Sequence, residues 1–229
     1  MQTIKAVIFD LDDTLYDFDT VHKEATKKLN QKAYELLGVD PALFDRIYHD
    51  AFRGVMQRMG TTVETGSSHS RTLRLQYTLE QLGKPIFPNV LLLYDVYWGY
   101  ILDHMQPEPY IKEALSYLQD KGYTIGCGTN MTAHIQYQKI ERLGLGQYFT
   151  FMMTSEESVI DKPSKTFFDM AVSKAGCPAD RCVFIGDDHG RDYEGALNAG
   201  LNAIWYNRKV KPEKGEKVIH SHRELIDIL

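Results

Sequence analysis

The sequence predicts an α/β fold: a doubly wound, Rossmann-like parallel sheet with a helical domain inserted after its first strand. Two observations predict it. Along most of the chain, short apolar runs alternate with segments of helical period, which is typical of a parallel sheet covered by helices on both faces. Residues 17–106 lack this alternation and contain only segments of helical period. We therefore expect a discontinuous α/β core of residues 1–16 and 107–229 and a helical cap domain of residues 17–106.

The expected core strands are short apolar runs that end in polar residues or glycine. They lie at residues 4–9, 123–127, 149–153, 182–185 and 203–206, the third being the weakest candidate. Helical segments are expected at residues 111–119, 133–143, 165–175 and 192–199. Each is followed by a glycine, which commonly ends a helix in the left-handed conformation: Gly122, Gly144, Gly176 and Gly200.

The expected cap is a bundle of helices. Apolar residues recur at helical spacing over residues 21–36 and again over 43–55, where Asp40 and Pro41 form an N-cap and first-turn pair. A polar loop is expected over residues 60–70, followed by a helix over 71–82, and Pro88 opens a fourth helix. Because this bundle joins the core only at its two ends, we expect it to move over the sheet and to admit only small substrates.

Composition and charge exclude several classes of protein. The chain has 229 residues and a net charge of −5, so it lacks the basic field that binds nucleic acid. Its three cysteines form no disulfide framework, and residues 1–5 leave no room for a signal peptide before the first strand. The most apolar stretch, residues 90–102, is too short to cross a bilayer. We therefore expect a cytoplasmic protein with neither a nucleic-acid nor a membrane partner.

Residues of one chemical kind follow the predicted strands, at the edge of a parallel sheet where ligands bind. Several carboxylates in one cleft repel each other unless a cation lies between them, and Mg²⁺ prefers a few carboxylates together with phosphate oxygens. The set therefore predicts a Mg²⁺ site for a phosphorylated substrate. It consists of Asp10-Leu-Asp12-Asp-Thr14, Thr129-Asn130, Lys162-Pro163 and Gly186-Asp187 through Asp192.

These four motifs, in this order and each after its own strand, resemble those of the haloacid dehalogenase (HAD) superfamily, mostly its phosphatases with an inserted helical cap. The resemblance implies that Asp10 is the nucleophile that forms an aspartyl phosphate. It implies that Asp12 acts as general acid and then as general base. Thr129 and the backbone of Asn130 would hold phosphate oxygens, and Lys162 would offset their charge.

The resemblance also implies the metal ligands. Mg²⁺ would be bound by the Asp10 carboxylate, the Asp12 carbonyl oxygen and Asp187. Asp192 would order a metal-bound water or Lys162. The implied reaction is Mg²⁺-dependent hydrolysis of a small phosphomonoester, a nucleotide or a sugar phosphate. The natural substrate, and whether the protein is a monomer or a homodimer, stay open.

Several nearby residues have simpler explanations. We expect Asp13 to be a turn residue, Lys165 to lie on the surface, and Asp188 and His189 to be loop residues near the site. In the cap, an arginine fork could bind a substrate carboxylate or second phosphate, but a solvated helix face is the expectation for Arg53, Arg71 and Arg74. The aromatic residues at 94, 97, 98 and 100 are expected to pack within the bundle.

Two other functions are considered. A dehalogenase of the same superfamily would need no Mg²⁺ and would generally lack the second aspartate of the first motif, so Asp12 and Asp187 oppose this alternative. A phosphorylated receiver domain also combines acids, threonine and lysine on a parallel sheet. Its accepting aspartate follows a middle strand of a shorter chain without an insert, whereas Asp10 follows the first predicted strand.

Overall fold

The computed structural model describes residues 3–208 and 215–229 and contains a parallel six-stranded sheet. The strand order is β3-β2-β1-β4-β5-β6, so β1 is central and the chain winds outward on both sides. This confirms the predicted α/β fold. The strands are β1 (Ala6–Phe9), β2 (Thr124–Thr129), β3 (Phe151–Thr154), β4 (Cys182–Gly186), β5 (Asn202–Tyr206) and β6 (Val218–Ile219).

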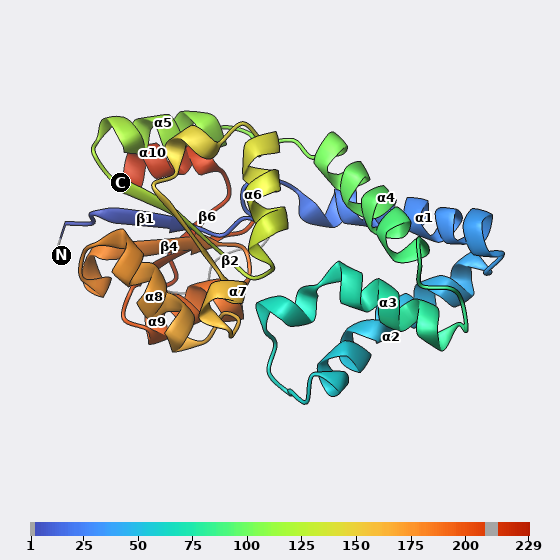
Figure 1. Cartoon of the computed structure of the whole chain (residues 1–229). Helices are drawn as coiled ribbons and strands as arrows, with labels where there is room; N and C mark the ends of the chain where they lie inside the picture. Colours follow the sequence, from blue (N-terminus) through green and yellow to red (C-terminus); the bar gives the residue numbers. More distant parts are fainter. Residues whose placement is uncertain (1–2, 209–214) are drawn as a thin grey trace.

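Helices cover both faces of the sheet because successive residues of each strand point to opposite sides. Val7 and Phe9 of β1 pack into one apolar cluster, whereas Ala6 and Ile8 pack into the other. Figure 1 shows α5, α6 and α10 on one side of the sheet and α8 and α9 on the other. The core helices are α5 (Ile111–Asp120), α6 (Ala133–Arg142), α7 (Ser155–Ser158), α8 (Lys165–Ala175), α9 (Gly195–Asn198) and α10 (Leu225–Ile228).

The helical insert, residues 17–106, forms a bundle beyond the end of the sheet toward which β1 runs (Figure 1). Tyr16 bridges to Pro107, so the two connections to the insert lie side by side. Asp17 caps the first helix and Asp40 caps the second through side-chain hydrogen bonds. The helices are α1 (Phe18–Leu37), α2 (Pro41–Arg58), α3 (Arg71–Gln81) and α4 (Asn89–His104).

The structure differs from the sequence-based prediction in several places, one of which is the unexpected strand β6. The helix expected from Asp192 is replaced by a π-helical turn over His189–Glu194, followed by the short α9. Residues 60–70, expected to be a loop, contain a 3-10 turn over Gly66–His69. Within residues 3–208 and 215–229, we find no helix with the length and apolar character that a membrane span requires.

Candidate active site

The carboxyl ends of β1, β2 and β4 open into one cavity of about 290 Å³ between the core and the insert. Asp10 directly follows β1, Thr129 ends β2, and Asp187 directly follows β4. All of the predicted site residues line this cavity. They are Asp10, Asp12, Thr129, Asn130, Lys162, Asp187 and Asp192. A cavity of this size admits a small molecule rather than a folded polypeptide.

Lys162 lies at the centre of the site and is almost fully buried. Its ammonium contacts Asp10 Oδ1 at 2.6 Å and Asp192 Oδ1 at 2.7 Å, and it donates to the carbonyl of Gly128 at 3.0 Å. Burial disfavours the ammonium, but the two carboxylates outweigh that effect and raise the pKa of Lys162 above its ordinary value. Lys162 is therefore a fixed positive charge beside Asp10.

Three carboxylates form the acidic side of the cavity. Oxygen atoms of Asp10, Asp187 and Asp192 lie within 4.8 Å of one another. Burial, with further contributions from neighbouring carboxylates, raises the pKa of Asp10, and burial together with Asp192 and Asp13 raises the pKa of Asp187 to about 7. Lys162 alone thus leaves this cluster short of positive charge. The oxygen donors and their crowding fit a hard divalent cation such as Mg²⁺.

The backbone at Gly186 explains how Asp192 reaches this cluster. A Cβ atom at Gly186 would lie 2.2 Å from Asp192 Oδ2, so only glycine leaves room for the carboxylate. The same oxygen accepts a hydrogen bond from the backbone N–H of Asp188 at 3.1 Å. The wide turn over His189–Glu194 therefore directs Asp192 back toward the end of β4.

Asp12 also lines the cavity, but its carboxylate is bound by residues outside the acidic cluster. Lys139 Nζ lies 2.8 Å and 3.0 Å from its two oxygens, Gln136 donates at 3.2 Å, and the hydroxyl of Tyr16 donates as well. Burial is the largest single influence and would raise the pKa of Asp12, but Lys139 and the hydrogen bonds from Tyr16 and Gln136 together outweigh it and lower the pKa. Asp12 is therefore held as a carboxylate, and its carbonyl oxygen as a metal ligand stays a prediction.

The side chains of Thr129 and Asn130 also form hydrogen bonds with other residues of the protein. Gln136 Nε2 donates to Thr129 Oγ1 at 2.6 Å, which links the threonine to the partners of Asp12. Asn130 Oδ1 accepts from the backbone N–H of Lys162 at 2.9 Å. The Asn130 side chain therefore fixes the segment that carries Lys162, and the contact of its backbone with substrate stays a prediction.

Sequence reasoning missed Lys139 and Gln136, both fully buried on α6. A signal was present, because Lys139 falls between Ile135 and Leu143 at steps of four residues, on the apolar face of the helix. A lysine on a buried face implies a buried carboxylate partner, since an unpaired ammonium is costly to bury.

The neighbouring residues follow the simpler explanations in part. Asp13 has φ of 60° and accepts from the backbone of Asp19, as a turn residue does, although it also lines the cavity. Lys165 pairs with Asp169 on the exposed face of α8. Asp188 lines the cavity and caps the following turn by accepting from Arg191 N. His189 contacts Glu216 and is absent from the described lining of the cavity.

Two insert arginines depart from the expectation of a solvated face. Arg71 and Arg74, on the first turn of α3, are half-buried and line the cavity. Arg53 does lie on the exposed surface and pairs with Asp50. The expected packing role holds for Tyr97 and Trp98, which are buried in the bundle and contact each other edge to face.

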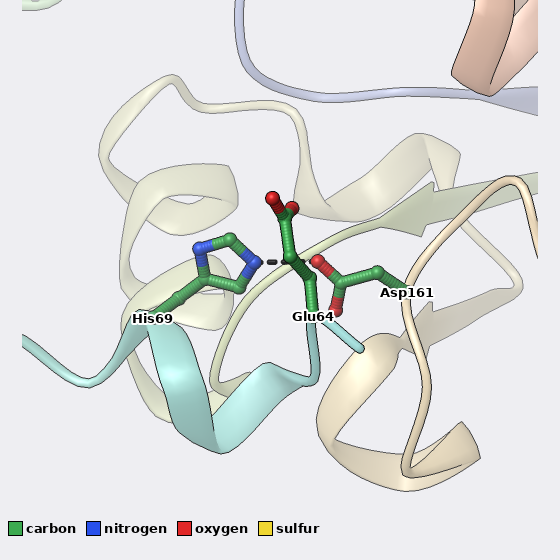
Figure 2. A group of neighbouring side chains, drawn as sticks. All are labelled: Glu64, His69 and Asp161. Atoms are coloured by element: carbon green, nitrogen blue, oxygen red, sulfur yellow. Dashed lines mark hydrogen bonds and ion pairs between the residues drawn. The ribbon is translucent and has the colours of Figure 1, made fainter. Parts of the chain in front are cut away.

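The insert also contacts the core at Asp161, the residue before Lys162; Figure 2 shows the interaction between His69 and Asp161, with Glu64 nearby. His69 Nε2 lies 2.5 Å from Asp161 Oδ2, and the backbone N–H of Asp161 donates to the carbonyl of Glu64. The Glu64 side chain pairs with Arg191 at 3.0 Å. These contacts join the loop after α2 to the two core segments that carry Lys162 and Arg191, both of which line the cavity.

Glycine permits a close approach between insert and core at Gly66. A Cβ atom at Gly66 would lie 2.2 Å from the backbone nitrogen of Glu156 in α7. Any other residue would force this part of the insert away from the core.

Comparisons with known proteins place this geometry in context. A family model described as haloacid dehalogenase-like hydrolase matches residues 4–200. A ribulose-1,5-bisphosphate 5-phosphatase of Halopiger xanaduensis is 35% identical over 88% of this chain and 84% of its own length. A glyceraldehyde 3-phosphate phosphatase of Methanothermobacter thermautotrophicus is 30% identical over 94% of this chain and 91% of its own.

Solved structures agree on the fold. A HAD phosphatase from Thermococcus onnurineus superposes with a TM-score of 0.76 at 21% identity, covering 98% of this chain and 97% of that one. A 2-haloacid dehalogenase from Pseudomonas syringae superposes with a TM-score of 0.79 at 26% identity, covering 99% and 98%. Because the fold serves both chemistries, the choice between them depends on the residues of the site.

Proposed function

Because the chain belongs to the haloacid dehalogenase-like hydrolases, with phosphatases among its relatives, we propose that it is a Mg²⁺-dependent sugar phosphatase that forms an aspartyl phosphate on Asp10. One observation carries the proposal. The Asp10 carboxylate stands at the end of the central strand, next to Lys162 and two further carboxylates, in a cavity of small-molecule size. The substrate class follows the names of the two phosphatases described above, each of which matches most of the chain.

The proposed reaction has two steps. In the first, an oxygen of Asp10 attacks phosphorus and the bond to the sugar oxygen breaks, giving an acyl phosphate and the free alcohol. In the second, water attacks the same phosphorus and releases inorganic phosphate and the Asp10 carboxylate. Lys162 and Thr129 line the cavity where the phosphoryl oxygens would lie. Bound to Asp10 and Asp187, Mg²⁺ would neutralise charge on those oxygens and hold Asp10 as a carboxylate.

Asp12 supplies and removes the proton in this proposal. It donates a proton to the departing sugar oxygen and then takes one from the attacking water. Lys139, Gln136 and Tyr16 hold it as a carboxylate, which is the form that activates water. The negative charge of a bound phosphate would favour the protonated form, which is the form needed for the first step. A dehalogenase needs neither this second aspartate nor a metal site, so both features favour the phosphatase.

We propose that the insert serves as the cap, with the boundaries predicted from the sequence. The loop after α2 touches the core beside Lys162, and α3 supplies two arginines to the cavity wall. This placement supports a role for the insert in selecting small phosphorylated metabolites and excluding water. The cytoplasmic location expected from the sequence remains a prediction.

A hydrolysis screen tests the proposed function. Sugar phosphates, nucleoside monophosphates and 2-haloacids would be incubated with the protein in Mg²⁺ or in chelator, and phosphate or halide release would be measured. We expect phosphate release from sugar phosphates in Mg²⁺ alone. Asp10→Asn should abolish it, whereas Asp169→Asn, a surface carboxylate on α8, should leave it unchanged. Halide release in chelator, or full activity of Asp10→Asn, would contradict the proposal.

A further inference from the structure

We propose that Arg71 and Arg74 form a second anion-binding subsite, so that the substrate carries another anionic group, phosphate or carboxylate, besides the phosphate that is transferred. This inference rests on the proposed function, because it assigns the second subsite to the same cavity as Asp10. Arg71 and Arg74 are three residues apart on the first turn of α3 and therefore share a face of the helix. Both side chains line the insert side of the cavity.

Neither arginine has a carboxylate within ion-pair distance among residues 3–208 and 215–229. Arg71 Nη2 donates to the hydroxyl of Tyr97 at 2.8 Å, and its buried Nε has no hydrogen-bond partner in that same part of the chain. Arg74 Nε donates to the carbonyl of Tyr48 at 2.7 Å. The partners of both guanidinium groups are thus neutral oxygens.

Aromatic rings provide the remaining contacts. The guanidinium carbon of Arg71 lies 4.7 Å from the ring centroid of Tyr97, and that of Arg74 lies 4.2 Å from the centroid of Tyr48. Such contacts offset only a small part of the free energy that removing an ion from water costs. The two like charges also repel each other. The rings therefore hold the guanidinium groups in place without neutralising them.

The other cations of the cavity are already paired with carboxylates. Lys162 contacts Asp10 and Asp192, and Arg191 contacts Glu64. The uncompensated charge at α3 also affects nearby His22. Its pKa is lowered to about 4, mainly by burial and further by the positive charges of Arg71 and Arg74. The positive charge left for a ligand is thus concentrated at the two arginines.

The geometry of arginine defines the class of ligand. A planar guanidinium group presents two parallel N–H donors that match the oxygens of a carboxylate or a phosphate. With Asp10 and Lys162 occupied by the transferred phosphate, the cavity of about 290 Å³ has room for a small carbon chain between the two anions. A sugar bisphosphate or a phosphorylated hydroxy acid fits this description.

The first test uses the wild-type protein and matched pairs of substrates. A pentose bisphosphate is compared with the pentose monophosphate, and 3-phosphoglycerate with glycerol 3-phosphate, by measuring kcat/KM with Mg²⁺. We expect the doubly anionic member of at least one pair to be preferred about tenfold or more, because a charge-assisted contact is gained. The first pair detects a phosphate subsite and the second a carboxylate subsite. No preference in either pair would overturn the inference.

The second test asks whether the arginines cause the preference. Arg71→Gln and Arg74→Gln should each reduce the ratio of kcat/KM between the preferred pair about tenfold, chiefly through KM, and Arg71→Lys should retain part of it. Arg53→Gln, on the exposed face of α2, is the matched control and should leave the ratio unchanged. Thermal melting would verify folding. If a variant does not fold, the wild-type comparison still decides.

The outcomes separate this inference from the proposed function. Equal losses on both members of a pair would show that the arginines bind the transferred phosphate, which overturns the second subsite but leaves the phosphatase intact. Absence of hydrolysis of every phosphate ester by the wild-type protein would instead refute the proposed function.

Discussion

Replacing Lys139 with methionine should destabilise the protein, because it removes the cation that neutralises Asp12. Lys139 is fully buried, and its ammonium lies 2.8 Å and 3.0 Å from the two carboxylate oxygens. Removing one partner of a buried ion pair costs about 3–5 kcal/mol, since the other charge stays buried without compensation. The side chain of Asp12 is 23% exposed and keeps Gln136 and Tyr16 as partners, so we expect the lower end, about 3 kcal/mol.

Urea unfolding and thermal melting would measure this cost. For a chain of this length, about 3 kcal/mol corresponds to a decrease in Tm of roughly 6–12 °C. Lys165→Met is the control, because its pair with Asp169 is exposed and contributes at most about 1 kcal/mol.

A double-mutant cycle tests the cause. If the penalty comes from the uncompensated Asp12 carboxylate, Lys139→Met combined with Asp12→Asn should lose much less stability than the sum of the two single variants. Additive losses, or a stability of Lys139→Met close to that of the wild type, would refute the ion pair as the reason.

Three further predictions concern the metal, a glycine and a histidine. Chelator should abolish phosphatase activity, and Mg²⁺ or Mn²⁺, but not the larger Ca²⁺, should restore it. Full activity in excess chelator would refute the proposed metal site. Gly186→Ala should lower activity more than tenfold, because its Cβ would displace Asp192, and unchanged kinetics would contradict that geometry. Burial lowers the pKa of His222 to about 4. As the pH falls, His222 is therefore protonated in the unfolded state before it is protonated in the folded state. Stability should fall as the pH drops from about 6.5 to 4. His222→Gln, assayed by urea unfolding, should weaken that fall, and an unchanged slope would exclude His222 as its cause.

The fold could be predicted from the sequence because each motif lies at or after the carboxyl end of a strand. Apolar runs ending at Asp10, Thr129 and Asp187 are strands whose ends lie together, as expected for a parallel sheet. β6 was missed because Val218–Ile219 is only two residues long and has no pattern to detect. The π-helical turn before α9 was missed because its shape depends on the Asp192 carboxylate reaching Gly186, a contact that local periodicity does not encode.

The motif residues of the candidate site were predicted from the sequence, but the residues that bind and position them were not. The motif residues could be named from the sequence alone. The role of Lys139 could not, because it depends on the direction in which the Asp12 side chain points. The burial of Arg71 and Arg74 depends on how α3 packs against Tyr48 of α2 and Tyr97 of α4, whereas an arginine near a helix start is by itself equally compatible with solvent. These are long-range properties, which explains why short-range pattern reasoning did not supply them.

The most direct test of the central claim is to trap phosphate on Asp10. Wild-type protein and the Asp12→Asn variant would each be mixed with Mg²⁺ and a sugar phosphate that the wild type hydrolyses. The reactions would be quenched in acid within one turnover and digested for mass spectrometry. The account predicts one phosphoryl group on the peptide that contains Asp10, assigned to Asp10 by fragmentation, and greater accumulation in Asp12→Asn because water is no longer activated. Turnover by the wild type without phosphate on that peptide, or with phosphate on another residue, would contradict it.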